Sequence, residues 1–128
     1  MQEYIQANQI SSRIKLLFRV KDEERNWLLA NAALFATPSL FEGFGRTPVE
    51  AAICKIPVIS TKATSLFEAT QGLCNYVENA TDEKELAELI LNIIENPPKA
   101  KHLEEIAQKL KERYKKENCG KLYLNLFL

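Results

Sequence analysis

The chain has 128 residues, about the length of one domain, with 46% hydrophobic and 27% charged residues. These values are typical of a soluble α/β domain with a buried core. Its 17 Lys and Arg residues balance its 17 Asp and Glu residues, which excludes a global basic field that would attract nucleic acid. The polar N-terminal segment lacks the pattern of a leader peptide, and no apolar run approaches the length needed to span a bilayer.

The predicted elements alternate between helices and strands. In chain order they are a helix at 2–9, a strand at 13–20, a helix at 22–32, a strand at 33–37, a helix at 48–54, a strand at 57–61, a helical turn at 65–70, a strand at 75–77, and helices at 82–95 and 99–118. Apolar runs predict the strands, and apolar residues at helical spacing predict the two long helices. Thr81 or Asp82 is the expected cap of the first long helix, and Gly120 is expected to mark a break after the second. This alternation predicts a parallel sheet covered by helices.

The cysteines and the one histidine favour structural roles. Cys54, Cys74 and Cys119 are widely spaced and form no Cys-x-x-Cys pair, so we expect reduced thiols in a cytoplasmic protein. Buried packing is the favoured role for them. His102 is the single histidine, which excludes a histidine-based metal site, and we expect it on a solvated helix face.

The loop between the strand at 33–37 and the next helix carries the strongest functional signal. Glu42 and Glu50 lie at its two ends, and Gly43 and Gly45 lie between them. Ligands of open α/β sheets bind at such a junction, outside the carboxyl ends of the strands. Free backbone N–H groups and the helix dipole suit this position to phosphate or to developing negative charge.

Purely structural roles are also open for the same residues. Thr47 followed by Pro48 is typical of an N-cap and the first helical position. Glu50 lies three residues after Thr47, so it could complete a capping box, with a stabilisation of about 0.5–2 kcal/mol. Glu42 could be a solvated loop carboxylate, and the glycines could serve turns.

A family resemblance favours the functional interpretation. The run Pro-Ser-x-x-Glu-Gly-Phe-Gly, followed by Pro-Val-Glu-Ala-Ala and Ile-Pro-Val-Ile-Ser, resembles the signature of the retaining sugar-nucleotide glycosyltransferases of family 4, glycosyltransferase group 1. These enzymes have the GT-B fold of two facing Rossmann-like domains. The resemblance implies that residues 1–128 form a single domain, part of the C-terminal donor-nucleotide-binding half. The expected fold is a Rossmann-like parallel sheet of about four strands flanked by helices, without the N-terminal acceptor domain and the first two strands of the donor domain.

The resemblance also implies roles for individual residues. Glu42 would lie beside the donor sugar as the catalytic carboxylate, and Glu50 would accept hydrogen bonds from the ribose hydroxyls. The backbone of Gly43, Phe44 and Gly45 would face the donor sugar. The backbone of Arg46 and Thr47 would contact the diphosphate, and that of Arg19 and Val20 would contact the base. The donor would be a UDP, GDP or ADP sugar, with no metal and no other cofactor. The acceptor would be a carbohydrate or a lipid-linked molecule.

Departures from the family pattern leave several outcomes open. The run from Thr61 to Glu68 has neither the expected glycines nor the expected proline, and no Arg-x-x-x-Lys pair is present to grip the diphosphate. Without the first two strands, the strand at 13–20 could pair with that at 33–37, another chain or the missing domain could complete the sheet, or the chain could fold poorly alone. The isolated chain is expected to be inactive.

The C-terminal tail has two interpretations. Tyr123, Leu126 and Phe127 could pack on an absent domain or on the last helices of this chain. The lysine-rich run before them is typical of a solvated face, and peripheral contact with the inner membrane surface is an alternative. The rival to an enzyme is a non-catalytic nucleotide-sugar-binding or interaction module of a glycosyltransferase assembly. A sugar-nucleotide epimerase of the same fold is a second rival.

Overall fold

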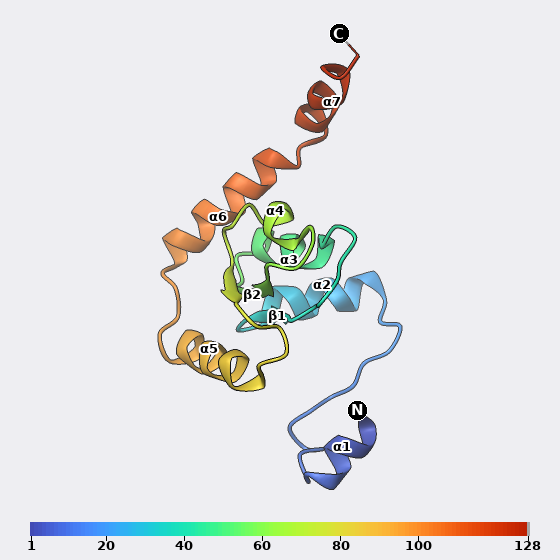
Figure 1. The fold of residues 1–128 in the computed structure, drawn as a ribbon, viewed down its shortest axis with the longest axis vertical. Coiled ribbons are helices and arrows are strands. Elements are labelled where there is room, and N and C mark those ends of the chain that lie inside the picture. The colour runs from blue at the N-terminus through green and yellow to red at the C-terminus, as the bar shows by residue number, and fades with distance from the viewer. Residues whose placement is uncertain (128) are drawn as a thin grey trace.

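The computed structural model describes residues 1–127 and has an α/β architecture, shown in Figure 1. Three parallel strands form one sheet in the order β1 (Phe35–Thr37), β2 (Val58–Thr61) and β3 (Asn75–Val77). The helices are α1 (Gln2–Ala7), α2 (Asp22–Asn31), α3 (Arg46–Ile53), α4 (Leu66–Ala69), α5 (Glu83–Glu95), α6 (Ala100–Arg113) and α7 (Lys116–Leu124). No helix in this described part is long and apolar enough to cross a membrane.

Helices cover both faces of the central strand β2, and all four of its residues are therefore buried. Because side chains alternate along a strand, Val58 and Ile59 point to opposite faces. Val58 belongs to a core cluster with residues of α2, α3 and α6, whereas Ile59 packs with Val77 and with Ile93 of α5. Figure 1 shows α5 on the side of the sheet away from α3 and α6. The prediction of a helix-covered parallel sheet is confirmed.

The predicted strand at 13–20 does not form, so the sheet has three strands instead of about four. Ile14, Leu17 and Phe18 are exposed, and Arg19 has a positive φ of 53° that interrupts an extended backbone. The idea that this segment pairs with the strand at 33–37 is wrong. Among the described residues nothing pairs with the outer edge of β1, because β2 is its one partner in the sheet.

Helix α3 begins two residues earlier than predicted, so the assignment of Thr47 as N-cap is wrong. Gly45 is the N-cap, with a left-handed φ of 86°, and Arg46 is the first helical residue. Pro48 lies at the third helical position, where the missing N–H would have no partner within the helix. The predicted capping box between Thr47 and Glu50 is therefore absent from this helix.

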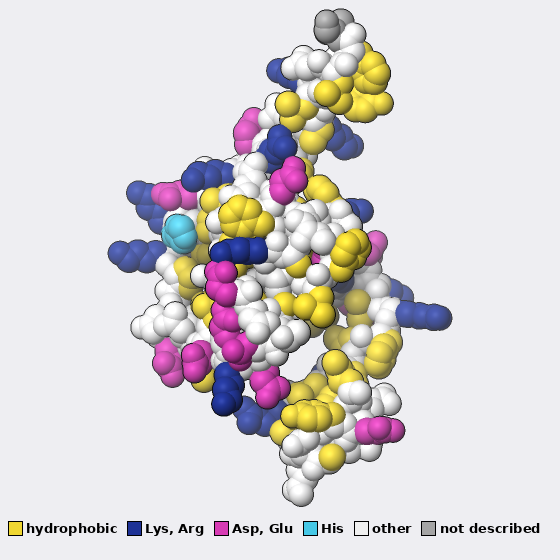
Figure 2. Space-filling model, viewed as in Figure 1, with side chains coloured by type: hydrophobic (Ala, Val, Ile, Leu, Met, Phe, Trp, Pro, Cys, Tyr) yellow, Lys and Arg dark blue, Asp and Glu magenta, His cyan; other side chains and the backbone are white. Residues whose placement is uncertain are grey.

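The predicted helix at 99–118 is two helices, α6 and α7, which meet at Tyr114 and Lys115. The break expected at Gly120 is wrong, because Gly120 lies within α7. Figures 1 and 2 show α7 extending away from the sheet, with hydrophobic side chains on its surface. Leu126 and Phe127 are 78% and 71% exposed. The interpretation that the tail packs on this chain's own helices is therefore wrong, and a partner for it stays a prediction.

Candidate functional site

The loop at 38–45 joins the carboxyl end of β1 to α3 and lies against the segment that follows β2. Three hydroxyls, from Thr61 at the end of β2 and from Thr64 and Ser65 just after it, bond the loop backbone. Thr61 Oγ1 donates to the Ser39 carbonyl at 2.6 Å, and Ser65 Oγ donates to the Glu42 carbonyl at 3.0 Å. Thr64 Oγ1 donates to the same Glu42 carbonyl at 2.7 Å and accepts from the Glu42 N–H at 3.1 Å. The two loops are thus joined at the carboxyl edge of the sheet, where ligands of such folds bind.

The Glu42 side chain is half-buried and held by a short chain of hydroxyls. Ser39 Oγ donates to Glu42 Oε1 at 3.1 Å and lies 3.2 Å from Thr37 Oγ1, at the end of β1. Glu42 is therefore fixed both through its backbone and through one carboxylate oxygen. A solvated loop carboxylate would not need this support, so the geometry favours a defined role for Glu42.

Glu50 lies on α3 and faces two guanidinium groups. Its Oε1 is 3.4 Å from Arg46 Nη2, and its Oε2 is 3.8 Å from Arg25 Nη2. The Glu50 side chain is 31% exposed, whereas that of Arg46 is 81% exposed. These ion pairs are long and partly solvated, so each holds the carboxylate weakly.

Arg25 was not predicted from the sequence as a site residue. It comes from α2 and pairs with Asp22 as well as with Glu50. Its Nε atom is buried and has no hydrogen-bond partner among the described residues. Only the packing of α2 beside α3 brings Arg25 to Glu50, and no local pattern in the sequence carries that information.

The remaining loop residues differ in exposure. Gly43 is exposed, whereas Gly45 is buried beneath Leu66, and Thr47 is exposed in the first turn of α3. The ring of Phe44 meets the ring of Tyr114 edge-on, with centroids 5.8 Å apart. This contact ties the loop to the end of α6.

Arg19 and Val20 are not joined to this loop by any hydrogen bond or ion pair in the described part of the chain. Both precede α2, and Val20 lines an open hollow of about 420 Å³ together with Leu17, Trp27 and Leu28. Glu42 lies in the loop and Glu50 on the helix that follows it, while the two residues expected to meet the base lie on a separate segment before α2.

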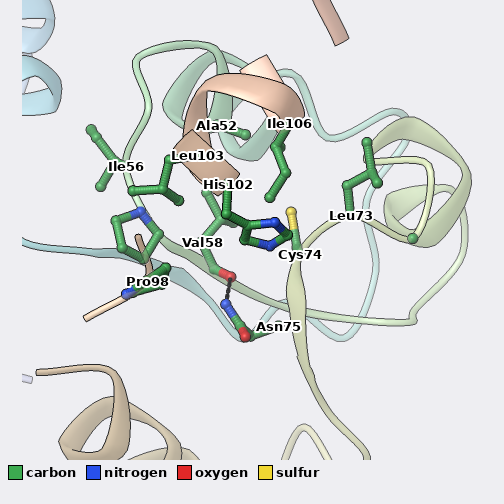
Figure 3. Close-up of a pocket in the computed structure, with 12 residues that line it drawn as sticks. Ala52, Ile56, Val58, Leu73, Cys74, Asn75, Pro98, His102, Leu103 and Ile106 are labelled. Atoms are coloured by element: carbon green, nitrogen blue, oxygen red, sulfur yellow. Dashed lines mark hydrogen bonds between the residues drawn. The ribbon is translucent and has the colours of Figure 1, made fainter. Parts of the chain in front are cut away.

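A smaller cavity of about 250 Å³ lies at the amino ends of β2 and β3, away from the candidate site (Figure 3). His102 and Cys74 line it, and Asn75 Nδ2 donates to the Val58 carbonyl at 3.1 Å. Burial raises the pKa of the Cys74 thiol to about 11, although hydrogen bonding with Thr70 and Tyr76 opposes the rise. A thiol that stays protonated at neutral pH is a poor nucleophile, so Cys74 is not a candidate nucleophile.

Comparison with known proteins identifies what the chain resembles. Residues 1–110 match the family model described as glycosyl transferases group 1. The chain is 37% identical over 93 residues to a probable sucrose-phosphate synthase of Thermosipho melanesiensis. The aligned region covers 73% of this chain and 21% of the relative. It is 32% identical over 108 residues to an alpha-galactosylglucosyldiacylglycerol synthase of Streptococcus pneumoniae, which covers 84% of this chain and 28% of that relative.

A solved sucrose-phosphate synthase from Thermosynechococcus elongatus has a similar fold. It superimposes with a TM-score of 0.79 at 25% sequence identity, over 98% of this chain and 33% of the larger one. This likeness supports the assignment of the fold as a Rossmann-like fragment of the GT-B type. The chain thus spans between about a fifth and a third of the length of these relatives.

Proposed function

The chain belongs to the glycosyl transferases group 1 family, and we propose that it is the donor-binding part of a retaining, family 4 glycosyltransferase. The whole protein would transfer a hexose from a nucleoside diphosphate sugar to an acceptor hydroxyl with retention of configuration. The observation that carries this proposal is the placement of Glu42 in the glycine loop and of Glu50 on α3, the helix that follows the loop. That loop leaves the carboxyl end of β1 and is held there by hydroxyls of the neighbouring strand segment.

Each carboxylate would have its own task. Glu42 would lie beside the donor sugar and stabilise the positive charge that develops as the glycosidic bond breaks. Glu50 would accept hydrogen bonds from the ribose hydroxyls, and its long contacts to Arg46 and Arg25 leave it able to do so.

The leaving diphosphate would sit at the start of α3. The first N–H groups of a helix have no partner inside it, and the helix dipole is positive at this end. The amides of Arg46 and Thr47 therefore suit an anion, and Gly43, Phe44 and Gly45 would face the sugar. This arrangement supports a departure of the nucleoside diphosphate that needs no metal ion. Arg19 and Val20 would meet the base if the segment before α2 turns toward the loop.

The partners and setting follow from the same proposal. The acceptor would be a carbohydrate or a lipid-linked molecule, in glycan, polysaccharide or glycolipid synthesis. One relative is named as a synthase of a glycosyl diacylglycerol, which supports a lipid acceptor. The open edge of β1 would be completed by an acceptor-side domain or another chain. A cytoplasmic enzyme with peripheral contact at the inner membrane surface is consistent with these roles.

The test is calorimetric titration of the folded chain with UDP, GDP and ADP. We expect one nucleotide to bind and Glu50→Ala to weaken that binding. Because Glu50 does not cap its helix, the variant should lose less than about 1 kcal/mol of stability, in line with partly exposed ion pairs. A folded chain that binds none of the three nucleotides would contradict the proposal.

A non-catalytic nucleotide-sugar-binding module is the second candidate. The observation in its favour is that the chain has no Arg-x-x-x-Lys pair to grip the diphosphate. Glu42→Gln separates the two functions when it is made in the protein that includes the acceptor-binding part. Loss of sugar transfer with intact nucleotide binding supports the enzyme with Glu42 as its catalytic carboxylate. No transfer in the unaltered protein supports the module, and unchanged transfer in the variant contradicts the role of Glu42.

A further inference from the structure

The hydroxyl of Thr64 bonds both backbone polar groups of Glu42, and we propose that Thr64 is the positioning residue that sets the catalytic carboxylate against the donor sugar. This inference rests on the proposed function, because it assigns a residue to the task of Glu42. Thr64 lies 22 positions away in the chain, on the segment that follows β2.

The geometry of the contact makes it specific. Thr64 Oγ1 accepts from the Glu42 N–H at 3.1 Å and donates to the Glu42 carbonyl at 2.7 Å. One hydroxyl thus bonds both the N–H and the carbonyl of Glu42, and the two bonds together restrain the position and the rotation of the Glu42 backbone. Ser65 adds a bond of 3.0 Å to the same carbonyl, and Ser39 bonds the carboxylate at 3.1 Å. The carboxylate is therefore oriented from the neighbouring strand segment and from its own loop.

The backbone of Thr64 is in an unfavourable conformation. Its φ is 47°, in the left-handed region that β-branched residues rarely adopt and that glycine adopts freely. Such a conformation persists only where surrounding contacts hold it. The two hydrogen bonds between the Thr64 hydroxyl and the Glu42 backbone are such contacts. A glycine at this position would relieve the backbone strain, but it would have no hydroxyl to form either hydrogen bond. The placement of the hydroxyl thus explains why a threonine can occupy a position that suits glycine.

Positioning of this kind matters for group transfer. Charge stabilisation in a transition state depends on groups already held at the right place, and small displacements reduce the rate strongly. A loop with two glycines around Phe44 would otherwise leave the carboxylate free to move. The Thr64 hydroxyl bonds both backbone groups of Glu42 and, with the Ser65 hydroxyl, ties that residue to the segment after β2.

Three variants test the proposal. Thr64→Val keeps the shape and removes the hydroxyl, Thr64→Ser keeps the hydroxyl, and Thr64→Gly removes the hydroxyl while accepting the positive φ. The glycine variant should fold even if the valine variant does not. Hydrogen exchange at the Glu42 amide, followed by NMR, should be about two- to tenfold faster in the valine and glycine variants. It should stay near the wild-type rate in the serine variant.

A second measurement separates positioning from simple support. Each variant is titrated with UDP and UDP-glucose, with GDP and GDP-mannose, or with ADP and ADP-glucose, whichever pair the wild-type chain binds. Removal of the hydroxyl should lower the affinity for the sugar nucleotide about two- to tenfold relative to that for the free nucleotide. The serine variant should bind the sugar nucleotide as tightly as the wild type. Affinity for the free nucleotide should stay unchanged, because Glu50 and α3 are not altered.

The outcomes are distinct. Unchanged exchange in the valine and glycine variants overturns the contact itself, and an equal loss for nucleotide and sugar nucleotide overturns the positioning role. A wild-type chain that binds no nucleotide refutes the proposed function and the positioning role with it. The exchange data still decide in that case whether Thr64 holds Glu42.

Discussion

Gly45 controls both the start of α3 and the shape of the loop, and its replacement by alanine gives the sharpest test of the structure. Gly45 has φ of 86° and caps α3. An alanine Cβ there would lie 2.5 Å from Leu66 Cδ2, closer than carbon atoms approach one another. Leu66 is fully buried, so its side chain has little room to move away. Backbone strain and overpacking together should destabilise the fold by about 2–4 kcal/mol.

The matched control is Gly43→Ala in the same loop. Gly43 is exposed, its φ is not in the positive region, and nothing lies within 4 Å of an added Cβ. Urea unfolding followed by circular dichroism should show Gly43→Ala within about 0.5 kcal/mol of the wild type. Gly45→Ala should lower the midpoint clearly, with a fall in Tm on the order of 10 °C. Equal stability of the two variants would refute the proposed packing of the loop against α4.

Three further predictions concern other parts of the chain. Asp82→Ala should cost about 1 kcal/mol in urea unfolding, because the Asp82 carboxylate accepts from two N–H groups at the start of α5, and Asp82→Asn should keep most of that stability. Burial raises the pKa of the Cys74 thiol to about 11, so Cys74 should react with iodoacetamide at pH 8 about a hundredfold more slowly than the exposed Cys54. Equal rates of the two cysteines, measured by mass spectrometry, would contradict the burial of Cys74. A hydrogen bond from Lys55 lowers the pKa of the Glu104 carboxyl. The pair should therefore stabilise the fold fully at pH values above the ordinary glutamate pKa, and this stabilisation should be lost as the pH falls through the lowered pKa. Glu104→Gln should therefore cost more stability at pH 7 than at pH 3, and an equal cost at both would argue against the pair.

The sequence predicted the elements that have strong local patterns. The strand at 57–61 and the helix at 82–95 formed within a residue or two of their expected bounds, because each carries an apolar pattern of the right period and a clear end signal. The segment at 13–20 has an equally apolar pattern but no partner strand, so it does not enter the sheet. A strand depends on a neighbour for its backbone hydrogen bonds, and a local pattern cannot show whether the neighbour is present.

The site residues stay a prediction, and the structure departs from the predicted local structure around them where tertiary contacts decide. Gly45 and Thr47 are both acceptable N-caps, and propensity alone could not choose between them. The positive φ of Gly45 and its close contact with Leu66 settle the choice in favour of the earlier start. Arg25 and Thr64 were missed because each reaches its glutamate from another element.

Glu42 in the loop and Glu50 on α3 are held by different physical means. Glu42 is fixed by short hydrogen bonds from hydroxyls, which depend on the parallel pairing of β1 with β2 and change little with salt. Glu50 is held by long, partly exposed ion pairs, which salt screens and which a ligand can displace. A rigid carboxylate suits charge stabilisation at a reacting centre, whereas an exchangeable one suits reversible binding of hydroxyls. The way each glutamate is held therefore agrees with the division of tasks proposed for them. The Thr64 variants should disturb the position of Glu42 and leave that of Glu50 unchanged.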